Sequence, residues 1–276
     1  MEESILVDDY NVCYRSEGEG EPLVLLHGTS FSHEVWDKTI KEASTLFTVY
    51  APDMPGFGCS DKPAVQYGLP FYVDFVRKFL DALKIEECAI AGMSMGGEVA
   101  AAFAAKYPGR VSRLVIVDAK GFSPLMKGLR TLPVLGRPLY LFMFNSREIL
   151  RRYVESMLYD KRMLKEELVD REWARIKDPS YRRSLSGNAK YLSTVDPGLP
   201  DMLKSVKAKT LIIWGKEDAL LPLEDAYKFN ECIARSDVLV LERCGHVPVI
   251  EKNEEFNRAL LTFLAEIDLY YVNDTK

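Results

Sequence analysis

The sequence contains no long, uninterrupted hydrophobic segment. A membrane-spanning helix needs an apolar run of about 18 residues or more, and none is present, so we expect no transmembrane segment. The segment that comes nearest to such a run is LPVLGRPLYLFMF at residues 132–144, but prolines interrupt it and it contains Arg137. The acidic start MEESILVDD lacks the basic and apolar regions of a secretory signal peptide. These absences favour a cytoplasmic protein.

The sequence also has few cysteines and no excess of positive over negative charge. The five cysteines are odd in number and scattered, with no C-x-x-C pair, which favours free thiols in a reducing compartment and indicates no metal site. Lys and Arg total 36 against 41 Asp and Glu, so the net charge of −5 gives no general attraction to nucleic acid or anionic membranes. We expect a small-molecule substrate, no nucleic-acid partner, and a monomer or homodimer.

Short apolar segments of strand length recur along the chain. They are residues 10–16, 22–26, 46–52, 88–92, 114–119, 210–215 and 238–242. Most of them do not alternate with polar residues, as is typical of parallel strands covered on both faces. Helix-like segments at 71–83, 98–107 and 254–267 lie between or after them. This alternation predicts the α/β class, with a doubly wound and mostly parallel sheet.

The alternation stops between residues 120 and 205. Long, charged, helix-forming stretches such as REILRRYVESMLYDKRMLKEELVDREWARIKD replace the strand-like runs. Because this segment is too long for a loop, we expect residues 120–205 to form a helical cap (lid) over the carboxyl end of the sheet. The core is then residues 1–119 and 206–276. Residues 132–144 would either line an apolar acyl channel or fill the interior of the cap.

A G-x-S-x-G motif, GMSMG, occupies residues 92–96 between a strand-like run and a helix-like segment. This context predicts a sharp turn that strains the backbone of Ser94 and lifts its hydroxyl into solvent. The flanking glycines would then approach neighbouring backbone too closely for a larger residue. We predict that Ser94 is a nucleophile, and the alternative is a glycine-rich helix start with an incidental serine.

A serine hydroxyl needs a base to accept its proton, and the chain has three histidines. His246 lies in ERCGHVPVIE after the last predicted strand, at the sheet edge to which Ser94 should point. We therefore predict that His246 is the general base. His27 is expected to brace the loop that it begins, and His33 is expected at the surface or at a helix start, without a role.

The remaining parts of such a site are a carboxylate and an oxyanion hole. WGKEDALLP offers Asp218 as the carboxylate that orients the base, with Glu217 as the fallback. Two backbone N–H groups must point at one place to hold an oxyanion. We assign them to Met95, directly after the nucleophile, and to Thr29, in the loop LLHGTSF.

Taken together, the segments LLHGTS, DMPGFGCSDKP, GMSMGG, GKEDALLP and CGHVPVIE resemble the successive signatures of the α/β-hydrolase superfamily. They occur in that superfamily's order, with Ser before Asp before His. The resemblance implies a triad of Ser94, Asp218 and His246, no metal or organic cofactor, and a helical cap after the sixth strand of the family's sheet.

Several branches share this scaffold. Haloalkane dehalogenases and epoxide hydrolases use an Asp nucleophile, so Ser94 argues against both. Hydrolases of meta-cleavage products, which split C–C bonds, resemble GMSMGG closely but often carry Asn before the nucleophile and Trp after the catalytic His. Those positions here are Met93 and Val247. Proline iminopeptidase-like enzymes usually have Trp beside the nucleophile, which Met93 and Met95 do not match.

We therefore expect first a cofactor-free serine carboxylesterase that acts through an acyl-enzyme, on an ester with an apolar acyl group. Flexible methionines beside the nucleophile suit a loosely defined apolar group, although Met93 and Met95 would equally well just fill space. A C–C hydrolase of meta-cleavage-type products is the alternative. A ligand-binding protein of this fold without catalysis is a third hypothesis.

Overall fold

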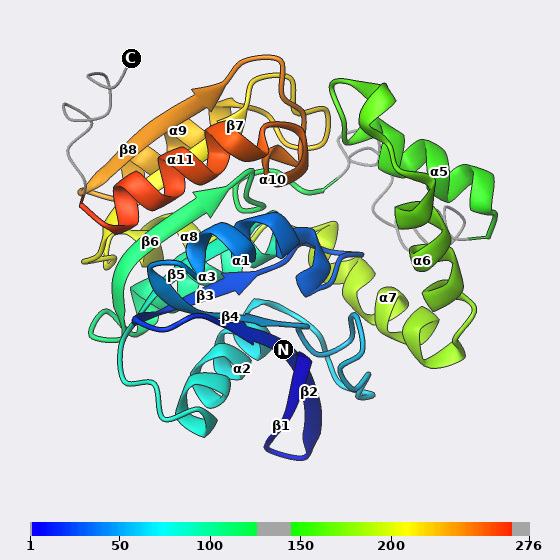
Figure 1. Ribbon diagram of the computed structural model, residues 1–276, viewed down its shortest axis with the longest axis horizontal. Coiled ribbons are helices and arrows are strands. Elements are labelled where there is room, and N and C mark those ends of the chain that lie inside the picture. The colour runs from blue at the N-terminus through cyan, green and yellow to red at the C-terminus, as the bar shows by residue number, and fades with distance from the viewer. Residues whose placement is uncertain (1, 126–144, 267–276) are drawn as a thin grey trace.

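The computed structural model describes residues 2–125 and 145–266. Its centre is an eight-stranded sheet with the order β1-β2-β4-β3-β5-β6-β7-β8 (Figure 1). The strands are β1 (Glu2–Val7), β2 (Tyr10–Glu17), β3 (Glu21–Leu26), β4 (Phe47–Pro52), β5 (Cys88–Met93), β6 (Val111–Val117), β7 (Lys209–Gly215) and β8 (Ser236–Leu241). Strands β3 to β8 pair in parallel, whereas β2 pairs antiparallel with β1 and β4.

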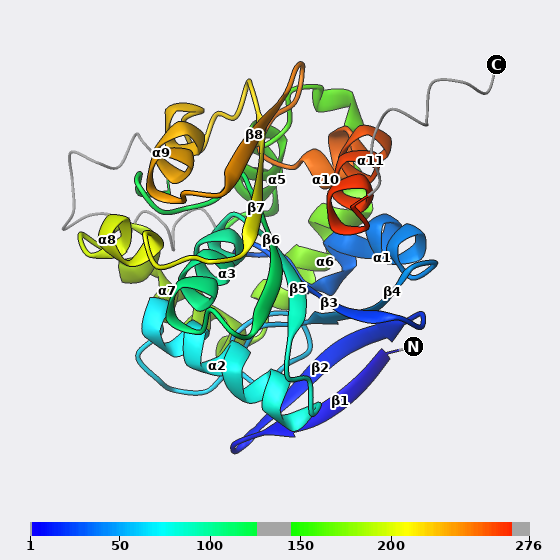
Figure 2. The ribbon, with the colours of Figure 1, turned by 90° about the vertical axis from the view of Figure 1, so that its left-hand side faces the viewer.

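Helices cover both faces of this sheet. The helical elements are η1 (His33–Trp36), α1 (Asp37–Ala43), α2 (Leu69–Ala82), α3 (Met95–Lys106), α5 (Arg147–Ser156), η3 (Lys161–Met163), α6 (Glu166–Ile176), α7 (Pro179–Leu192), α8 (Leu199–Leu203), α9 (Glu224–Cys232), α10 (Pro248–Glu251) and α11 (Asn253–Leu264). Figure 2 shows α1 and α11 on one side of the sheet and α2, α3, α8 and α9 on the other. Every residue of β5 is buried between the two layers, which confirms the doubly wound arrangement.

The predicted strands and helices are all present, with ends that differ by a few residues. The strand β1 was not predicted. Five of its six residues are exposed or half-buried, and it pairs only with β2 at the sheet edge. An edge strand with little buried surface leaves little hydrophobic pattern in the sequence.

Within its described residues, 118–125 and 145–208, the segment between β6 and β7 contains α5, η3, α6, α7 and α8 and no strand. Figure 1 shows α5, α6 and α7 grouped beyond the carboxyl ends of the parallel strands. We propose that these helices are the cap. The apolar stretch 132–144 lies outside the described residues. No helix within residues 2–125 and 145–266 is both long and apolar enough to cross a membrane.

The sequence predicted that all five cysteines are free thiols, and this prediction is wrong for Cys13 and Cys59. Cys13 on β2 and Cys59 in the loop after β4 are joined as a disulfide, with their Cα atoms 5.8 Å apart. They are 46 residues apart in sequence, but β2 and β4 are neighbours in the sheet. The pairing therefore depends on a tertiary contact that cysteine spacing does not reveal. Cys88, Cys232 and Cys244 are free.

Candidate active site

Ser94 occupies the turn between β5 and α3. Its φ of 56° and ψ of −118° are strained for a residue with a side chain. Two hydrogen bonds fix this turn to the end of β6 and to the chain after it: the Ser94 N–H donates to the Val117 oxygen (2.9 Å), and the Ser94 oxygen accepts from the Lys120 N–H (3.0 Å). The predicted strain is confirmed, but the side chain does not lie in open solvent, because Ser94 is only 3% exposed.

The glycines around Ser94 are required by close backbone contacts. A Cβ atom on Gly92 would lie 2.1 Å from the Gly96 oxygen, and one on Gly96 would lie 2.4 Å from the Leu26 oxygen. Real Cβ atoms do not approach backbone oxygens so closely. The sequence-based prediction that only the smallest residue fits here is confirmed.

His246 lies between Ser94 and Asp218. Its Nε2 is 3.1 Å from Ser94 Oγ, and its Nδ1 is 2.8 Å from Asp218 Oδ2. Asp218 is held in turn, because its Oδ1 accepts hydrogen bonds from the N–H groups of Leu220 (2.7 Å) and Leu221 (3.0 Å). Both partners are shielded from water, with side chains 2% and 0% exposed. This chain of contacts can pass a proton from the serine hydroxyl to the imidazole while the carboxylate stabilises the resulting charge.

The structure also distinguishes Asp218 from its neighbour Glu217. The exposed Glu217 accepts a hydrogen bond from the Cys244 N–H (3.0 Å) and makes no contact with the imidazole. The predicted site residues Ser94, Asp218 and His246 are therefore brought together, and the fallback carboxylate is not among them.

The proposed oxyanion-hole residues lie beside the nucleophile. Thr29 is 3% exposed and Met95 is fully buried, and the Thr29 hydroxyl lies 3.5 Å from the Met95 sulfur. A Cβ atom on Gly28 would lie 3.0 Å from Ser94 Cβ, so the loop after β3 passes directly over the serine. We propose that the N–H groups of Thr29 and Met95 form the oxyanion hole.

Two buried histidines stabilise the loops beneath this site. His27 accepts a hydrogen bond from the Met54 N–H (2.9 Å) through Nε2, and its Nδ1 lies 2.7 Å from the Gly28 oxygen. The predicted bracing role is thus confirmed, and burial lowers the pKa of His27 to about 4. His33 begins a short helix, η1, so the helix-start alternative is confirmed, and the surface alternative is excluded because His33 is buried. Its Nδ1 lies 2.9 Å from Oδ1 of the buried Asp53.

Asp53 was not singled out by the sequence. Its Oδ1 accepts hydrogen bonds from both the N–H (2.7 Å) and the ring of His33, and its Oδ2 accepts one from the Cys59 N–H (2.8 Å). Burial acts to raise the pKa of Asp53, but hydrogen bonds and charge from His33 outweigh it and lower that pKa to about 2. Asp53 is therefore an ionised anchor between the loops after β3 and β4.

Glu251 is a second residue that sequence reasoning missed. Its Oε1 accepts a hydrogen bond from the Gly245 N–H (2.9 Å), and its Oε2 accepts one from the Tyr159 N–H (2.7 Å). Burial raises the pKa of its carboxyl against these hydrogen bonds. Glu251 thus ties the loop that carries His246 to the turn after α5.

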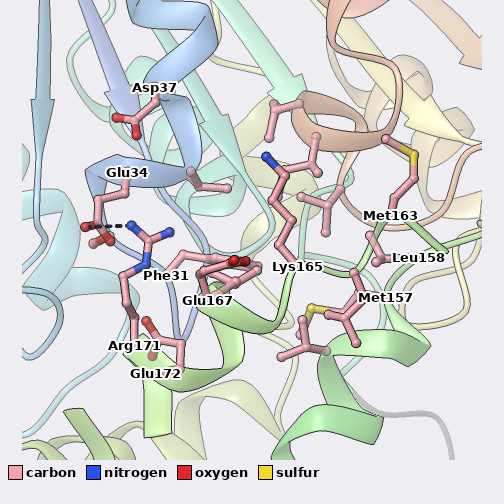
Figure 3. A pocket seen from close by; sticks show the side chains of 18 of the residues that line it. Phe31, Glu34, Asp37, Met157, Leu158, Met163, Lys165, Glu167, Arg171 and Glu172 are labelled. Atoms are coloured by element: carbon pink, nitrogen blue, oxygen red, sulfur yellow. Dashed lines mark hydrogen bonds and ion pairs between the residues drawn. The ribbon is translucent and has the colours of Figure 1, made fainter. Parts of the chain in front are cut away.

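A cavity of about 220 Å³ lies next to this loop, between α5, α6, η1 and α10. Figure 3 shows Glu34 and Arg171 on one wall, 3.1 Å apart, and Met157 and Leu158 on the opposite wall. Val247, directly after His246, also lines it. The lining thus combines an apolar wall with ion-paired charges. Met93 and Met95 are fully buried, and they are not among the residues that line this cavity.

One set of side chains has the spacing of metal ligands. An oxygen of Asp118, an oxygen of Asp218 and a ring nitrogen of His246 lie within 4.8 Å of one another. Two of the three belong to the proton-relay chain described above. The expectation that the site works without metal or cofactor stays a prediction.

Comparison with known proteins agrees with the fold. Residues 23–259 match the model of the alpha/beta hydrolase family. The chain is 30% identical to 2-hydroxy-6-oxo-6-phenylhexa-2,4-dienoate hydrolase of Comamonas testosteroni, over 94% of this chain and 93% of that protein. It is 32% identical to 2-hydroxymuconate semialdehyde hydrolase of Pseudomonas sp. (strain CF600), over 91% of this chain and 89% of that protein.

Solved structures show the same architecture. The meta-cleavage product hydrolase CumD of Pseudomonas fluorescens IP01 superimposes with a TM-score of 0.84 at 30% identity, covering 96% of this chain and 98% of that one. A membrane phospholipase A, described as a bacterial virulence factor, superimposes with a TM-score of 0.85 at 26% identity, covering 96% and 86%.

Proposed function

Because the chain belongs to the alpha/beta hydrolase family, we propose that it is a serine hydrolase that cleaves a carbon–carbon bond in a meta-cleavage-type 2-hydroxy-6-oxodienoate. The main support is the 3.1 Å contact between Ser94 Oγ and His246 Nε2. The second support is that the similar proteins named above are hydrolases of such compounds. Carboxylesterase activity, which the sequence placed first, fits these relatives less well.

The reaction begins when Ser94 Oγ attacks the 6-oxo carbonyl carbon and His246 takes the hydroxyl proton. The N–H groups of Thr29 and Met95 hold the developing oxyanion, and Asp218 stabilises the imidazolium. The attack takes place on the 2,6-dioxo tautomer of the substrate, which forms when the proton of the 2-hydroxyl moves to C5. The C5–C6 bond then breaks, and its electron pair is delocalised onto the 2-oxo oxygen. That oxygen takes the proton from the His246 imidazolium, and the product leaves as a 2-hydroxydienoate. Water, deprotonated by His246, releases the acyl group from Ser94 as a carboxylic acid, so the net reaction consumes one water.

The cavity that Val247 lines, one residue after His246, suits the part of the substrate that does not react. Its apolar wall of Met157, Leu158 and Val247 can bury a phenyl or alkyl substituent. Arg171 and Arg175 both pair with Glu34, at 3.1 Å and 2.8 Å. Arg175 also pairs with Glu172, so both arginines are already engaged by carboxylates, and we propose that the cavity selects the hydrocarbon end of the substrate.

Ester hydrolysis is the second candidate. The likeness to a phospholipase A favours it, as do Met93 and Val247, which stand where meta-cleavage product hydrolases often carry Asn and Trp. The two reactions share Ser94, His246 and the oxyanion hole. They differ in the leaving group, which is an alkoxide in one case and a stabilised carbanion in the other.

The test compares 2-hydroxy-6-oxo-6-phenylhexa-2,4-dienoate with p-nitrophenyl butyrate. We expect the coloured dienoate to bleach, with benzoate as a product, at a higher kcat/KM than the ester. Ser94→Ala should reduce both activities by a factor of about 10⁴ or more, and Ser193→Ala, a change at an exposed serine, should alter neither. Ester turnover without bleaching would select the second candidate, and undiminished activity of Ser94→Ala would exclude both.

A further inference from the structure

A carboxyl group that the proposed reaction does not use lies directly behind the triad. Asp118 follows β6, and Asp218 lies in the loop after β7. These strands are parallel neighbours, paired through Val117 and Ile213, so both carboxyls lie at the same edge of the sheet. Asp118 is fully buried. Its φ is 39°, a strained value for a residue other than glycine.

The contacts of Asp118 are asymmetric. Its Oδ1 accepts a hydrogen bond from the Gly215 N–H (2.9 Å). Its Oδ2 is buried, and no donor in residues 2–125 and 145–266 reaches it. A buried carboxylate oxygen without a donor is costly. The neighbouring group is the other carboxylate, because oxygens of Asp118 and Asp218 and a ring nitrogen of His246 lie within 4.8 Å of one another.

Two adjacent buried carboxylates cannot both stay ionised at low cost. Asp218 has donors for its negative charge, since the N–H groups of Leu220 and Leu221 and the ring of His246 all contact it. Asp118 has one donor, Gly215. If one of the two carboxyls carries a proton, that proton therefore belongs on Asp118. There it also gives the buried Oδ2, which has no donor, a hydrogen bond to make.

We propose that Asp118 is a neutral carboxylic acid whose Oδ2–H donates a hydrogen bond to Asp218, so that the acid pair carries a single negative charge behind His246. Asp118 is then a positioning residue: it holds the carboxylate that orients the imidazole and moderates the charge on it. The proposal rests on the proposed hydrolase function of Ser94, His246 and Asp218.

The surroundings of Asp118 support the neutral form. The ionisable groups that face it are Asp218 after β7, Cys244 and His246 after β8, and Glu251 of α10. Burial first, and then the charges of Asp218 and Glu251, raise the pKa of Asp118 well above its ordinary value against the hydrogen bond from Gly215. Burial also raises the pKa of the Cys244 thiol, which keeps that neighbour neutral.

The first test does not need turnover. Infrared spectra at pH 7 should show a neutral carboxylic acid band in wild type that disappears in Asp118→Asn. Glu172 and Glu251 are present in both proteins, and burial raises their pKa values as well, so their contribution cancels in the difference spectrum. Absence of a difference band would overturn the proposal whether or not the protein hydrolyses the dienoate.

The second test uses the pH dependence of kcat/KM. Asn can replace a neutral acid, because its amide can donate to Asp218 and accept from Gly215. Asp118→Asn should therefore keep kcat/KM within about threefold and leave the acid limb of the pH profile in place.

Asp118→Ala removes the donor, so the negative charge is concentrated on Asp218. The apparent pKa of the acid limb of the profile should rise, and kcat should fall about tenfold or more. A fall of that apparent pKa in Asp118→Asn would show that Asp118 was ionised. An unchanged profile in Asp118→Ala would exclude its positioning role.

Discussion

The main-chain oxygen of Met157 accepts a hydrogen bond of 2.7 Å from the N–H of His246. Met157 is the first residue after α5, so the segment between β6 and β7 directly holds the backbone of the proposed base. Glu251 reinforces the same contact from α10, through Gly245 and Tyr159. The position of His246 in the site therefore depends on how this helical segment packs against the core.

Gly245→Ala should disturb this contact. A Cβ atom on Gly245 would lie 2.3 Å from the Met157 oxygen and 2.8 Å from the Tyr159 nitrogen. Because these are backbone atoms, the loop must move and carry His246 away from Ser94, and kcat should fall about 10²-fold. Gly109→Ala is the matched control, since no atom lies within 4 Å of its added Cβ. Equal kcat values in the two variants would show that the loop position does not control the base.

The pair of His33 and Asp53 should make stability depend on pH. Hydrogen bonding to His33 lowers the pKa of Asp53 to about 2, so its stabilising contribution is lost as pH falls from about 4 towards 2. Hydrogen bonding and charge from Asp53 outweigh burial and raise the pKa of His33, so its contribution is full below pH 6.5 and is lost as pH rises through the folded-state pKa. The pair stabilises the fold most between about pH 4 and pH 6.5.

Urea unfolding of wild type and His33→Gln at several pH values tests this dependence. We expect the variant to lose about 2 kcal/mol at pH 5.5 and clearly less at pH 8.5. Taking the difference between the two proteins removes most of the contribution of His27, whose pKa of about 4 also makes stability pH-dependent. A difference that is constant across this range would mean that His33 is not charged in the folded protein.

A buried ion pair beneath the nucleophile provides a separate prediction. Lys120 is 1% exposed, its Nζ lies 3.0 Å and 2.9 Å from the carboxylate oxygens of the fully buried Glu98, and its N–H holds the Ser94 oxygen. Tyr191 of α7 also donates to Glu98, at 2.5 Å. Lys120→Met leaves that carboxylate uncompensated and should cost about 3–5 kcal/mol of unfolding free energy.

The double variant Lys120→Met/Glu98→Gln should recover part of this loss, because Gln carries no charge. Lys190→Met, on the exposed face of α7, is the control and should change stability by no more than about 0.5 kcal/mol. If Lys120→Met unfolds at the same denaturant concentration as wild type, the pair does not stabilise the turn that carries Ser94.

The sequence predicted those parts of the molecule that have a local signature. Ser94 stands directly after the buried strand β5, and Asp218 and His246 lie in the loops after β7 and β8. Parallel strands bring such positions to the same edge of the sheet. Asp53 and Asp118 also follow strands, but their roles depend on partners in other loops, His33 and Asp218. No spacing rule predicts these contacts.

Other features depended on packing between distant segments. Pairing of Cys13 with Cys59 requires β2 to lie beside β4, and the cavity next to Val247 requires α5 and α6 to pack against η1 and α10. Hydrophobic periodicity predicts that helices exist but not which faces meet. For the same reason the sequence did not separate C–C hydrolysis from ester hydrolysis.

The most direct test of the account is covalent labelling of the nucleophile with a fluorophosphonate, followed by mass spectrometry. Wild type should take up one label per chain, on Ser94. Asp218→Asn and His246→Ala, if folded, should react at least about 10³-fold more slowly, because Ser94 then lacks its oriented base. A label on another residue, or labelling of His246→Ala at the wild-type rate, would contradict the assignment of Ser94 and His246 as nucleophile and base.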